Sequence, residues 1–399
     1  LVNQPGLVWE LLSVHHRSLA KGRPLRKARL LLGEGLLTSE GELHARQRRV
    51  MRPAFHHARV AGFTDTMAAS ALDAQAAWHD GETVEISSEM MRLTQRIVAR
   101  TLFATDIEPA EAVRASRALD TLVGGFGLVL LPFSAVLLRL PLPAARRIRR
   151  AKAELERTIS AMIATRRATG DRGDLLSMLL FATDENGRAT VSEELVRDEA
   201  MTVFLAGHDT TGNGLAWSWH LLAHHPEQEA HWHDELDAVL GGRQPTFSDV
   251  PDLPFTRNIF TEALRLYPPA PAVGRQALED IELGGHAIRK GSVIQVCQWL
   301  LHRDPRFFPE PDRFRPERWT PQMEAELPRG CYLPFGIGPR YCVGRELAGL
   351  IGTVALATLG QRWRLRATTG PIVETVARSI TLRPRHGLPM RLERRGREL

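Results

Sequence analysis

The chain has 399 residues, 43% of them hydrophobic, which is more than one hydrophobic core usually organises, so we expect one large unit with two lobes or two domains. Its three cysteines are too few, and odd in number, for a disulfide framework, which excludes the small disulfide-rich class and favours a reducing, cytoplasmic location. The net charge of +6 comes from dispersed basic residues. Nucleic-acid binding therefore has little support, whereas an acidic protein partner is compatible with the charge.

The first two-thirds of the chain shows apolar residues at helical spacing, and strand-like segments appear only later. The sequence thus predicts a mainly α fold with a minor β portion. The predicted helices are 43–55, 61–78, 90–103, 144–168, 175–181, 193–224, 255–267 and 347–359. The predicted strands are a Gly-Gly hairpin over 280–288, then 292–297, 372–383 and 390–393.

The stretch nearest to a membrane span is 124–138, which is apolar apart from Ser134. It is shorter than the ~20 residues that a spanning helix needs, and Pro132 interrupts it. We therefore expect a buried or lid-like segment here and no transmembrane span. At the beginning of the chain, residues 1–5 are typical of the end of a strand that leads into a helix.

The middle of the predicted helix 193–224 carries Ala206-Gly207-His208-Asp209-Thr210-Thr211. A glycine there costs about 1 kcal/mol relative to alanine, so we expect a compensating role. Gly207 would let a planar group lie against the helix, and Asp209 would relay protons. Thr210 would bond the carbonyl four residues back or admit a water. A packing glycine beside a solvated aspartate is the alternative interpretation.

Glu262 and Arg265 lie three residues apart on the predicted helix 255–267. This spacing places them on one face, close enough for a charge-assisted bidentate bond. An exposed pair of this kind contributes only about 0–1 kcal/mol. We therefore interpret the pair as structural.

The segment 335–344 is a glycine-rich loop that delivers Cys342 to the start of an apolar helix. The helix N-terminus, its free amides and nearby Arg340 are expected to favour the thiolate, the form that ligates metal. Glycines at 336, 338 and 344 would let the backbone pass close to a large flat group. This pattern suits the axial ligand of a haem iron. A buried structural cysteine beside a turn is the alternative.

These segments together resemble the cytochrome P-450 superfamily. The loop 335–344 matches the haem-binding signature F-G-x-G-x-R-x-C-x-G, and 206–211 matches the oxygen-activation motif A-G-x-D/E-T-T/S. Residues 262–265 and 316–318 match the E-x-x-R helix and the P-E-R loop of that family. The resemblance implies a large helical lobe and a small β-rich lobe, with the haem between the long distal helix and the cysteine loop. Residues 1–399 would then form one domain that lacks an N-terminal helix and strand.

The resemblance also implies roles for individual residues. Arg318 would complete a Glu262–Arg265–Arg318 network that locks the cysteine loop in place. His44 and Arg48, with Arg275 and Arg340, would bind the haem propionates. The residues implied to contact haem b are His44, Arg48, Ala206, Gly207, Arg275, Phe335, Gly336, Arg340, Cys342 (the axial ligand) and Gly344. The catalytic residues implied are Asp209 and Thr210.

By the same resemblance the protein is a haem-thiolate monooxygenase that inserts one oxygen atom of dioxygen into a C–H bond. The apolar segments 124–142 and 271–273 favour a lipophilic substrate such as a terpenoid, carotenoid, fatty acid or polyketide. The chain has no flavin- or nicotinamide-binding glycine fingerprint, so a ferredoxin- or flavodoxin-type protein would supply the electrons. The basic face near the cysteine, including Arg345, would be the surface where it docks.

Two other functions stay open: a haem-thiolate isomerase or peroxygenase, and a haem-binding sensor without turnover. A different metal site is also conceivable, because His220 and His224 are spaced like zinc ligands and further histidines follow at 225, 231 and 233. No glutamate follows the first of them, and the group flanks Pro226. We therefore interpret these histidines as a solvated helix end.

Overall fold

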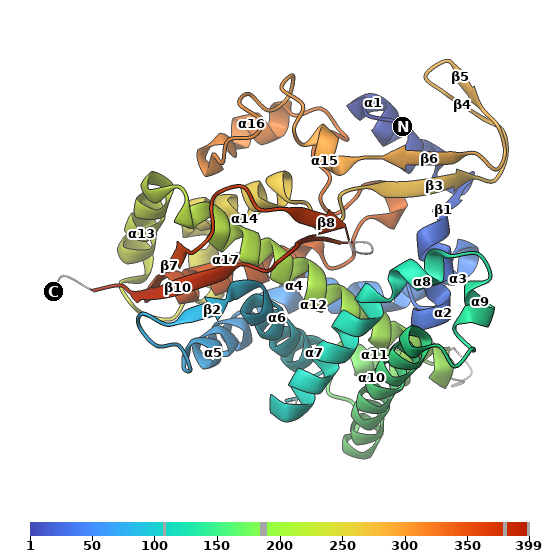
Figure 1. Ribbon diagram of the computed structural model, residues 1–399, viewed down its shortest axis with the longest axis horizontal. Coiled ribbons are helices and arrows are strands. Elements are labelled where there is room, and N and C mark those ends of the chain that lie inside the picture. Colours follow the sequence, from blue (N-terminus) through green and yellow to red (C-terminus); the bar gives the residue numbers. More distant parts are fainter. Residues whose placement is uncertain (107–108, 184–189, 378–380, 397–399) are drawn as a thin grey trace.

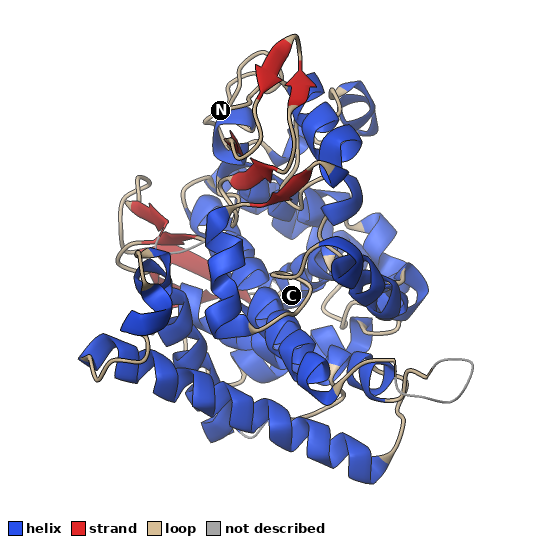
Figure 2. Cartoon of the chain, turned by 90° about the vertical axis from the view of Figure 1, so that its right-hand side faces the viewer, coloured by secondary structure: helices blue, strands red, loops and turns tan. Residues whose placement is uncertain are grey.

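The computed structural model describes residues 1–106, 109–183, 190–377 and 381–396. Helices make up most of it, and Figure 2 shows the strands in two groups at the edge of the helical body. The predicted mainly α fold with a minor β portion is therefore confirmed. The helices are α1 (Pro5–Trp9), α2 (Arg23–Leu32), α3 (Gly41–Met51), α4 (His57–Ala61), α5 (Thr64–Gln75), α6 (Ile86–Leu102), α7 (Pro109–Gly124), α8 (Phe126–Leu130), α9 (Ser134–Leu137), α10 (Pro143–Thr169), α11 (Leu175–Leu180), α12 (Glu193–Ala223), α13 (Pro226–Leu240), α14 (Pro254–Leu266), α15 (Gln298–Leu301), α16 (Pro321–Glu326) and α17 (Arg345–Gly360).

The strands form two three-stranded antiparallel sheets and two hairpins (Figure 1). In one sheet β3 lies between β1 and β6, and in the other β10 lies between β2 and β7. The predicted hairpin over 280–288 is present as β4–β5, and its turn residues Gly284 and Gly285 both have positive φ, as a two-residue turn requires. The strands are β1 (Leu19–Lys21), β2 (Thr83–Glu85), β3 (Val273–Ala277), β4 (Ile281–Leu283), β5 (His286–Ile288), β6 (Val293–Val296), β7 (Trp363–Ala367), β8 (Thr375–Ala377), β9 (Leu382–Pro384) and β10 (Pro389–Arg394).

Helix α12 runs through the centre of the helical lobe (Figure 1). It packs against α6, α14 and α17, and its side chains Trp217 and Trp219 are completely buried. The hydroxyl of Ser192 caps its first turn by accepting a hydrogen bond from the Leu195 amide at 3.2 Å. The helix ends before Pro226, as the sequence predicts.

The apolar segment 124–138 folds into the end of α7 and the two short helices α8 and α9. Several of its side chains are exposed, most of all Phe133. Among the described residues, no helix combines the length and the apolar character needed to cross a bilayer. The segment predicted as one strand over 372–383 holds two strands, β8 and β9, and residues 378–380 lie outside the described part.

Candidate active site

The cysteine loop is a compact turn that leads into α17. The Cys342 amide donates to the Phe335 carbonyl at 2.8 Å, so the two ends of the loop meet. Gly336 and Gly338 both have positive φ, which explains the need for glycine at each. A Cβ at Gly338 would lie 2.2 Å from the backbone oxygen of Leu12, so this glycine serves a close contact within the protein. At Gly336 and Gly344 a Cβ would meet no atom closer than 3.8 Å.

Cys342 keeps accessible surface although its sulfur lies deep among protein atoms. Desolvation raises the pKa of the Cys342 thiol, and the Gly344 amide, Arg48 and Arg345 only partly oppose this. The expectation that the loop alone favours the thiolate is therefore wrong, because desolvation outweighs the helix end and Arg340 is not among the opposing charges. The sulfur becomes an anion when a metal replaces its proton.

The middle of α12 has accessible surface on one side. Ala206 is exposed and Thr210 half-buried, whereas their neighbours His208 and Asp209 are buried. The Thr210 hydroxyl donates to the Ala206 carbonyl at 2.8 Å, which is the first of the two bonds that the sequence predicts for it. This hydroxyl keeps its lone pairs available to a water on the accessible side.

Gly207 faces another helix. A Cβ at this position would lie 2.6 Å from Cγ2 of Val98 on α6. Five residues later on α12, a Cβ at Gly212 would lie 2.9 Å from the Cα of Met91, which is also on α6. The prediction that Gly207 makes room for a planar group is therefore wrong, and the alternative of a packing glycine holds. Ala206 is the residue of this motif that presents a small side chain to open space.

Asp209 is held by an arginine that the sequence analysis missed. The Arg383 guanidinium of β9 binds the Asp209 carboxylate and also Asp120 of α7, the latter at 2.9 Å. Asp209 is buried, so the alternative of a solvated aspartate is wrong. Nothing in the local sequence indicates this pairing, because 174 residues separate the two side chains.

A cluster of basic side chains lies between β1, α3, β3 and the cysteine loop. Lys21, His44 and Arg275 are buried, and the charge of Arg340 helps to lower the pKa of each of them. Desolvation is the largest cause in each case, and the resulting pKa is about 7 for Lys21 and about 10 for Arg275. Arg340 binds Glu40 at 2.8 Å. Its other nitrogen Nη1 is buried and has no hydrogen-bond partner among the described atoms.

His44 and Arg48 differ from what the sequence analysis expects. Burial and the cations around it lower the pKa of His44 to about 4, so His44 is a neutral donor at pH 7 rather than a cation. Arg48 directs Nη1 to the Tyr341 carbonyl at 2.8 Å, and its guanidinium lies 4.3 Å from the centre of the Tyr341 ring. Arg48 thus contacts the cysteine loop, and its positive charge works to lower the pKa of both His44 and Cys342. Lys21 also belongs to this basic cluster, although no sequence motif indicates it.

These residues fit a haem. Cys342 keeps accessible surface and can offer its sulfur to the iron, and the accessible strip at Ala206 is free of side-chain bulk. A buried cluster of basic groups with an unpaired Arg340 nitrogen needs an anionic partner, which the two carboxylates of a haem would provide.

Glu262, Arg265 and Arg318 meet in a buried network. Arg265 donates two hydrogen bonds of 2.8 Å to the Glu262 carboxylate, and Arg318 donates one of 2.9 Å. The Trp319 indole adds a further bond of 2.9 Å. Arg265 also binds the carbonyls of His302 and Pro311. The network therefore joins α14 to the loops that precede the cysteine loop.

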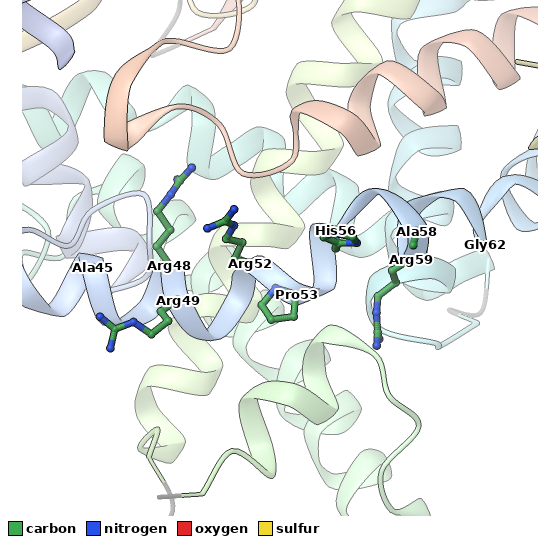
Figure 3. A pocket seen from close by; sticks show the side chains of 9 residues that line it. All are labelled: Ala45, Arg48, Arg49, Arg52, Pro53, His56, Ala58, Arg59 and Gly62. Carbon is green, nitrogen blue, oxygen red and sulfur yellow. The ribbon is translucent and has the colours of Figure 1, made fainter. Parts of the chain in front are cut away.

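A groove of about 1010 Å³ opens beside α3 and α4 (Figure 3). Arg48 and Arg52 point to one side of it, and Arg59 points to the other. Arg49 and His56 also line it. Since Arg48 binds Tyr341 beside Cys342, this basic groove begins next to the cysteine loop.

The histidines after residue 219 do not form a metal site. In the described ranges, no three His, Cys, Asp or Glu side chains are placed to hold a metal ion. The interpretation of a solvated helix end is wrong for His220 and His233, which are buried. His220 and His224 instead lie 3.2 Å from the carbonyls of Pro371 and Thr369, so they fix the chain that leads to β8.

Comparisons with known proteins agree with this site. The model of the cytochrome P450 family matches residues 1–388. "Cyclooctatin synthase" of Streptomyces melanosporofaciens is 42% identical, over 92% of this chain and 80% of that protein. "Cyclooctat-9-en-7-ol 5-monooxygenase" of the same organism is 40% identical, over 93% and 81%.

A solved structure, the heme domain of cytochrome P450DA, superposes with a TM-score of 0.85 and 28% identity, over 99% of this chain and 86% of that one. The family model spans all the motifs of the site, including the cysteine loop. The chain therefore belongs to the cytochrome P450 family and is a haem-dependent monooxygenase.

Proposed function

We propose that the protein hydroxylates a lipophilic small molecule of the terpenoid class, inserting one oxygen atom of dioxygen into a C–H bond. The observation that carries the proposal is the accessible Cys342 in a complete loop motif, next to a buried basic cluster with an unpaired Arg340 nitrogen. A haem bound through a cysteine thiolate activates dioxygen and favours cleavage of the O–O bond. We infer haem b, because the cysteines at 297, 331 and 342 are too far apart for covalent haem attachment.

Thr210 and Asp209 would handle the protons that dioxygen activation consumes. The Thr210 hydroxyl donates to Ala206 and can accept a hydrogen bond from a water on the accessible side of α12. Asp209 lies one residue away with its carboxylate bound to Arg383. A proton relay through Asp209 therefore requires it to exchange the contact with Arg383 for one with water.

The substrate class rests on two supports. The name of one relative describes oxygenation at carbon 5 of an unsaturated alcohol. In the chain itself, the segment 124–142 presents exposed apolar side chains, including Leu131, Phe133 and Val136. Exposed apolar side chains of this kind suit contact with a hydrocarbon-rich substrate.

Product analysis with a surrogate ferredoxin system tests the proposal directly. With a terpenoid alcohol as substrate, we expect a product one oxygen atom heavier, labelled when ¹⁸O₂ is supplied. A product without the label would indicate an isomerase or a peroxygenase. Tight binding with no product from any lipophilic compound would indicate a sensor.

Thr210→Ala should uncouple dioxygen consumption from product formation. Loss of the hydroxyl removes the group that holds the proton-bearing water, and positioned proton transfer contributes roughly 10²–10⁴-fold. We expect product per dioxygen to fall at least about tenfold, with peroxide formed instead. Thr211→Ala, at the buried neighbouring position, serves as the control. Unchanged coupling in Thr210→Ala would favour a peroxygenase or isomerase.

We infer that the electron donor is an acidic ferredoxin- or flavodoxin-type protein that docks at the basic groove. Charge reversal with Arg49→Glu or Arg52→Glu should slow its association by about tenfold at low salt, because steering depends on the summed charge. The effect should disappear at high salt. Arg150→Glu on α10, outside the groove, is the control. Equal slowing by all three variants would contradict a specific docking surface.

The cytoplasm is the location that fits such a donor. It is supported by Cys297 and Cys331, which take part in no disulfide and whose thiols persist in a reducing compartment.

A further inference from the structure

The segment 33–40 connects the distal helix α12 with the basic cluster. Its residues form turns between α2 and α3. Two carboxylates of α12 hold its first half: Asp198 accepts the Glu34 amide at 2.8 Å, and Glu199 accepts the Leu36 amide at 2.9 Å. Backbone amides bonded to carboxylates are stronger contacts than neutral hydrogen bonds.

Two glycines allow this close approach. A Cβ at Gly33 would lie 2.1 Å from Oδ2 of Asp198, and Gly33 has a φ of +68°. A Cβ at Gly35 would lie 2.1 Å from Oγ1 of Thr202. The segment therefore packs closely against α12, and the absence of side chains at the two glycines allows its amides to reach the two carboxylates.

The second half of the segment reaches the basic cluster. The Thr38 hydroxyl bonds the carbonyls of Gly33 and Gly35, which ties the two halves together. Lys21 donates from Nζ to the carbonyls of Leu36 and Ser39, at 2.8 and 2.7 Å.

Glu40 completes this path. Its carboxylate accepts the Lys21 amide and binds Arg340 at 2.8 Å. A continuous series of contacts thus runs from Asp198 and Glu199 to Arg340.

We propose that Asp198 and Glu199 are positioning residues of the cofactor site, which hold Glu40, and through it Arg340 and Lys21, in the arrangement that receives the carboxylates of the haem. The inference rests on the proposed role of the basic cluster in binding those carboxylates. Neither α12 residue forms a hydrogen bond or ion pair with the cluster among the described residues, so apart from the charge interaction of Glu199 with Lys21 each acts through the segment 33–40.

The burial of Glu199 supports this role. Glu199 is completely buried, and its Oε1 has no hydrogen-bond partner in the described part of the chain. The pKa of Glu199 is raised to about 7, by desolvation above all and also by Asp198, and the Leu36 amide and Lys21 oppose this rise. An apolar residue would fill this place in α12 without that penalty. The hydrogen bond from the Leu36 amide explains why a carboxylate occupies this buried position.

Hydrogen exchange and haem transfer on the purified holoenzyme test the inference. Glu199→Leu removes the acceptor of the Leu36 amide, and leaving this amide unpaired costs enough to change an opening equilibrium by about tenfold. We expect the amides of 33–40 to exchange about tenfold faster. Transfer of haem to apomyoglobin should accelerate by a similar factor. Glu199→Gln keeps an acceptor oxygen and should stay close to the wild type in both measurements.

Three further variants make the outcomes distinct. Asp198→Ala, at a half-buried position, repeats the test if Glu199→Leu fails to fold. Glu194→Leu changes an exposed carboxylate of α12 and should alter neither rate. Faster exchange with unchanged haem transfer in Glu199→Leu and Asp198→Ala would overturn the inference. Arg340→Ala should accelerate haem transfer alone; if it does not, the proposed carboxylate-binding role of the cluster fails instead.

Discussion

Cys342→Ser is expected to abolish monooxygenation and the red-shifted Soret band of the reduced, carbon monoxide-bound protein that thiolate ligation gives. Serine has nearly the same shape, so the loop, with its bond between the Cys342 amide and the Phe335 carbonyl, should persist. The variant lacks the sulfur anion that donates electron density to iron.

Cys297→Ser is the matched control for this experiment. Cys297 is half-buried, and its sulfur donates to the Pro271 carbonyl at 3.5 Å, a bond that a serine hydroxyl can replace. Both the spectrum and the product yield should match the wild type. A Cys342→Ser protein that keeps its pigment and its oxidising power would refute thiolate ligation.

Glu262→Ala is expected to give the largest loss of stability. It leaves the buried Arg265 and Arg318 without their shared carboxylate, and removing one partner of a buried ion pair costs about 3–5 kcal/mol. It also leaves the Trp319 indole unpaired. With an unfolding entropy of about 2.1 cal/mol/K per residue, each kcal/mol shifts the unfolding temperature of a 399-residue chain by about 1 °C, so thermal unfolding of the holoenzyme should begin roughly 4–6 °C lower.

Glu324→Ala provides the comparison. Glu324 binds Arg257 at 3.2 Å on the surface, where a pair contributes about 0–1 kcal/mol. Its unfolding temperature should change by no more than about 1 °C. If the unfolding temperature fell equally in the two variants, the buried Glu262 network would contribute no more to stability than an exposed ion pair.

Local spacing made much of the site predictable. The ten residues of the cysteine loop and the i, i+3 pair Glu262–Arg265 are short-range patterns whose geometry the backbone fixes. The central helix was equally predictable from sequence. Ser192 is a typical N-cap residue, Pro226 cannot continue a helix, and the two mark the helix limits within two or three residues.

Contacts between distant segments were beyond prediction. Gly207 packs on Val98 and Arg383 binds Asp209, and neither partner can be identified without the tertiary fold. The same holds for Lys21, which enters the basic cluster from β1. The error over the charge of Cys342 has a related origin: sequence shows nearby charges but not how many protein atoms exclude water from the sulfur.

The bridge from β9 to α12 bears on how far the chain could be shortened. Arg383 lies only 16 residues from the last residue, Leu399, yet it supplies the counter-charge of a buried acid at the centre of the molecule. A version that stops before residue 381 would strand the Asp209 carboxylate without a cation, and would also lose β10 from between β2 and β7. Arg395 also binds the Gly360 carbonyl and the Asp237 carboxylate, so trimming and fusion at this end should begin beyond Arg395.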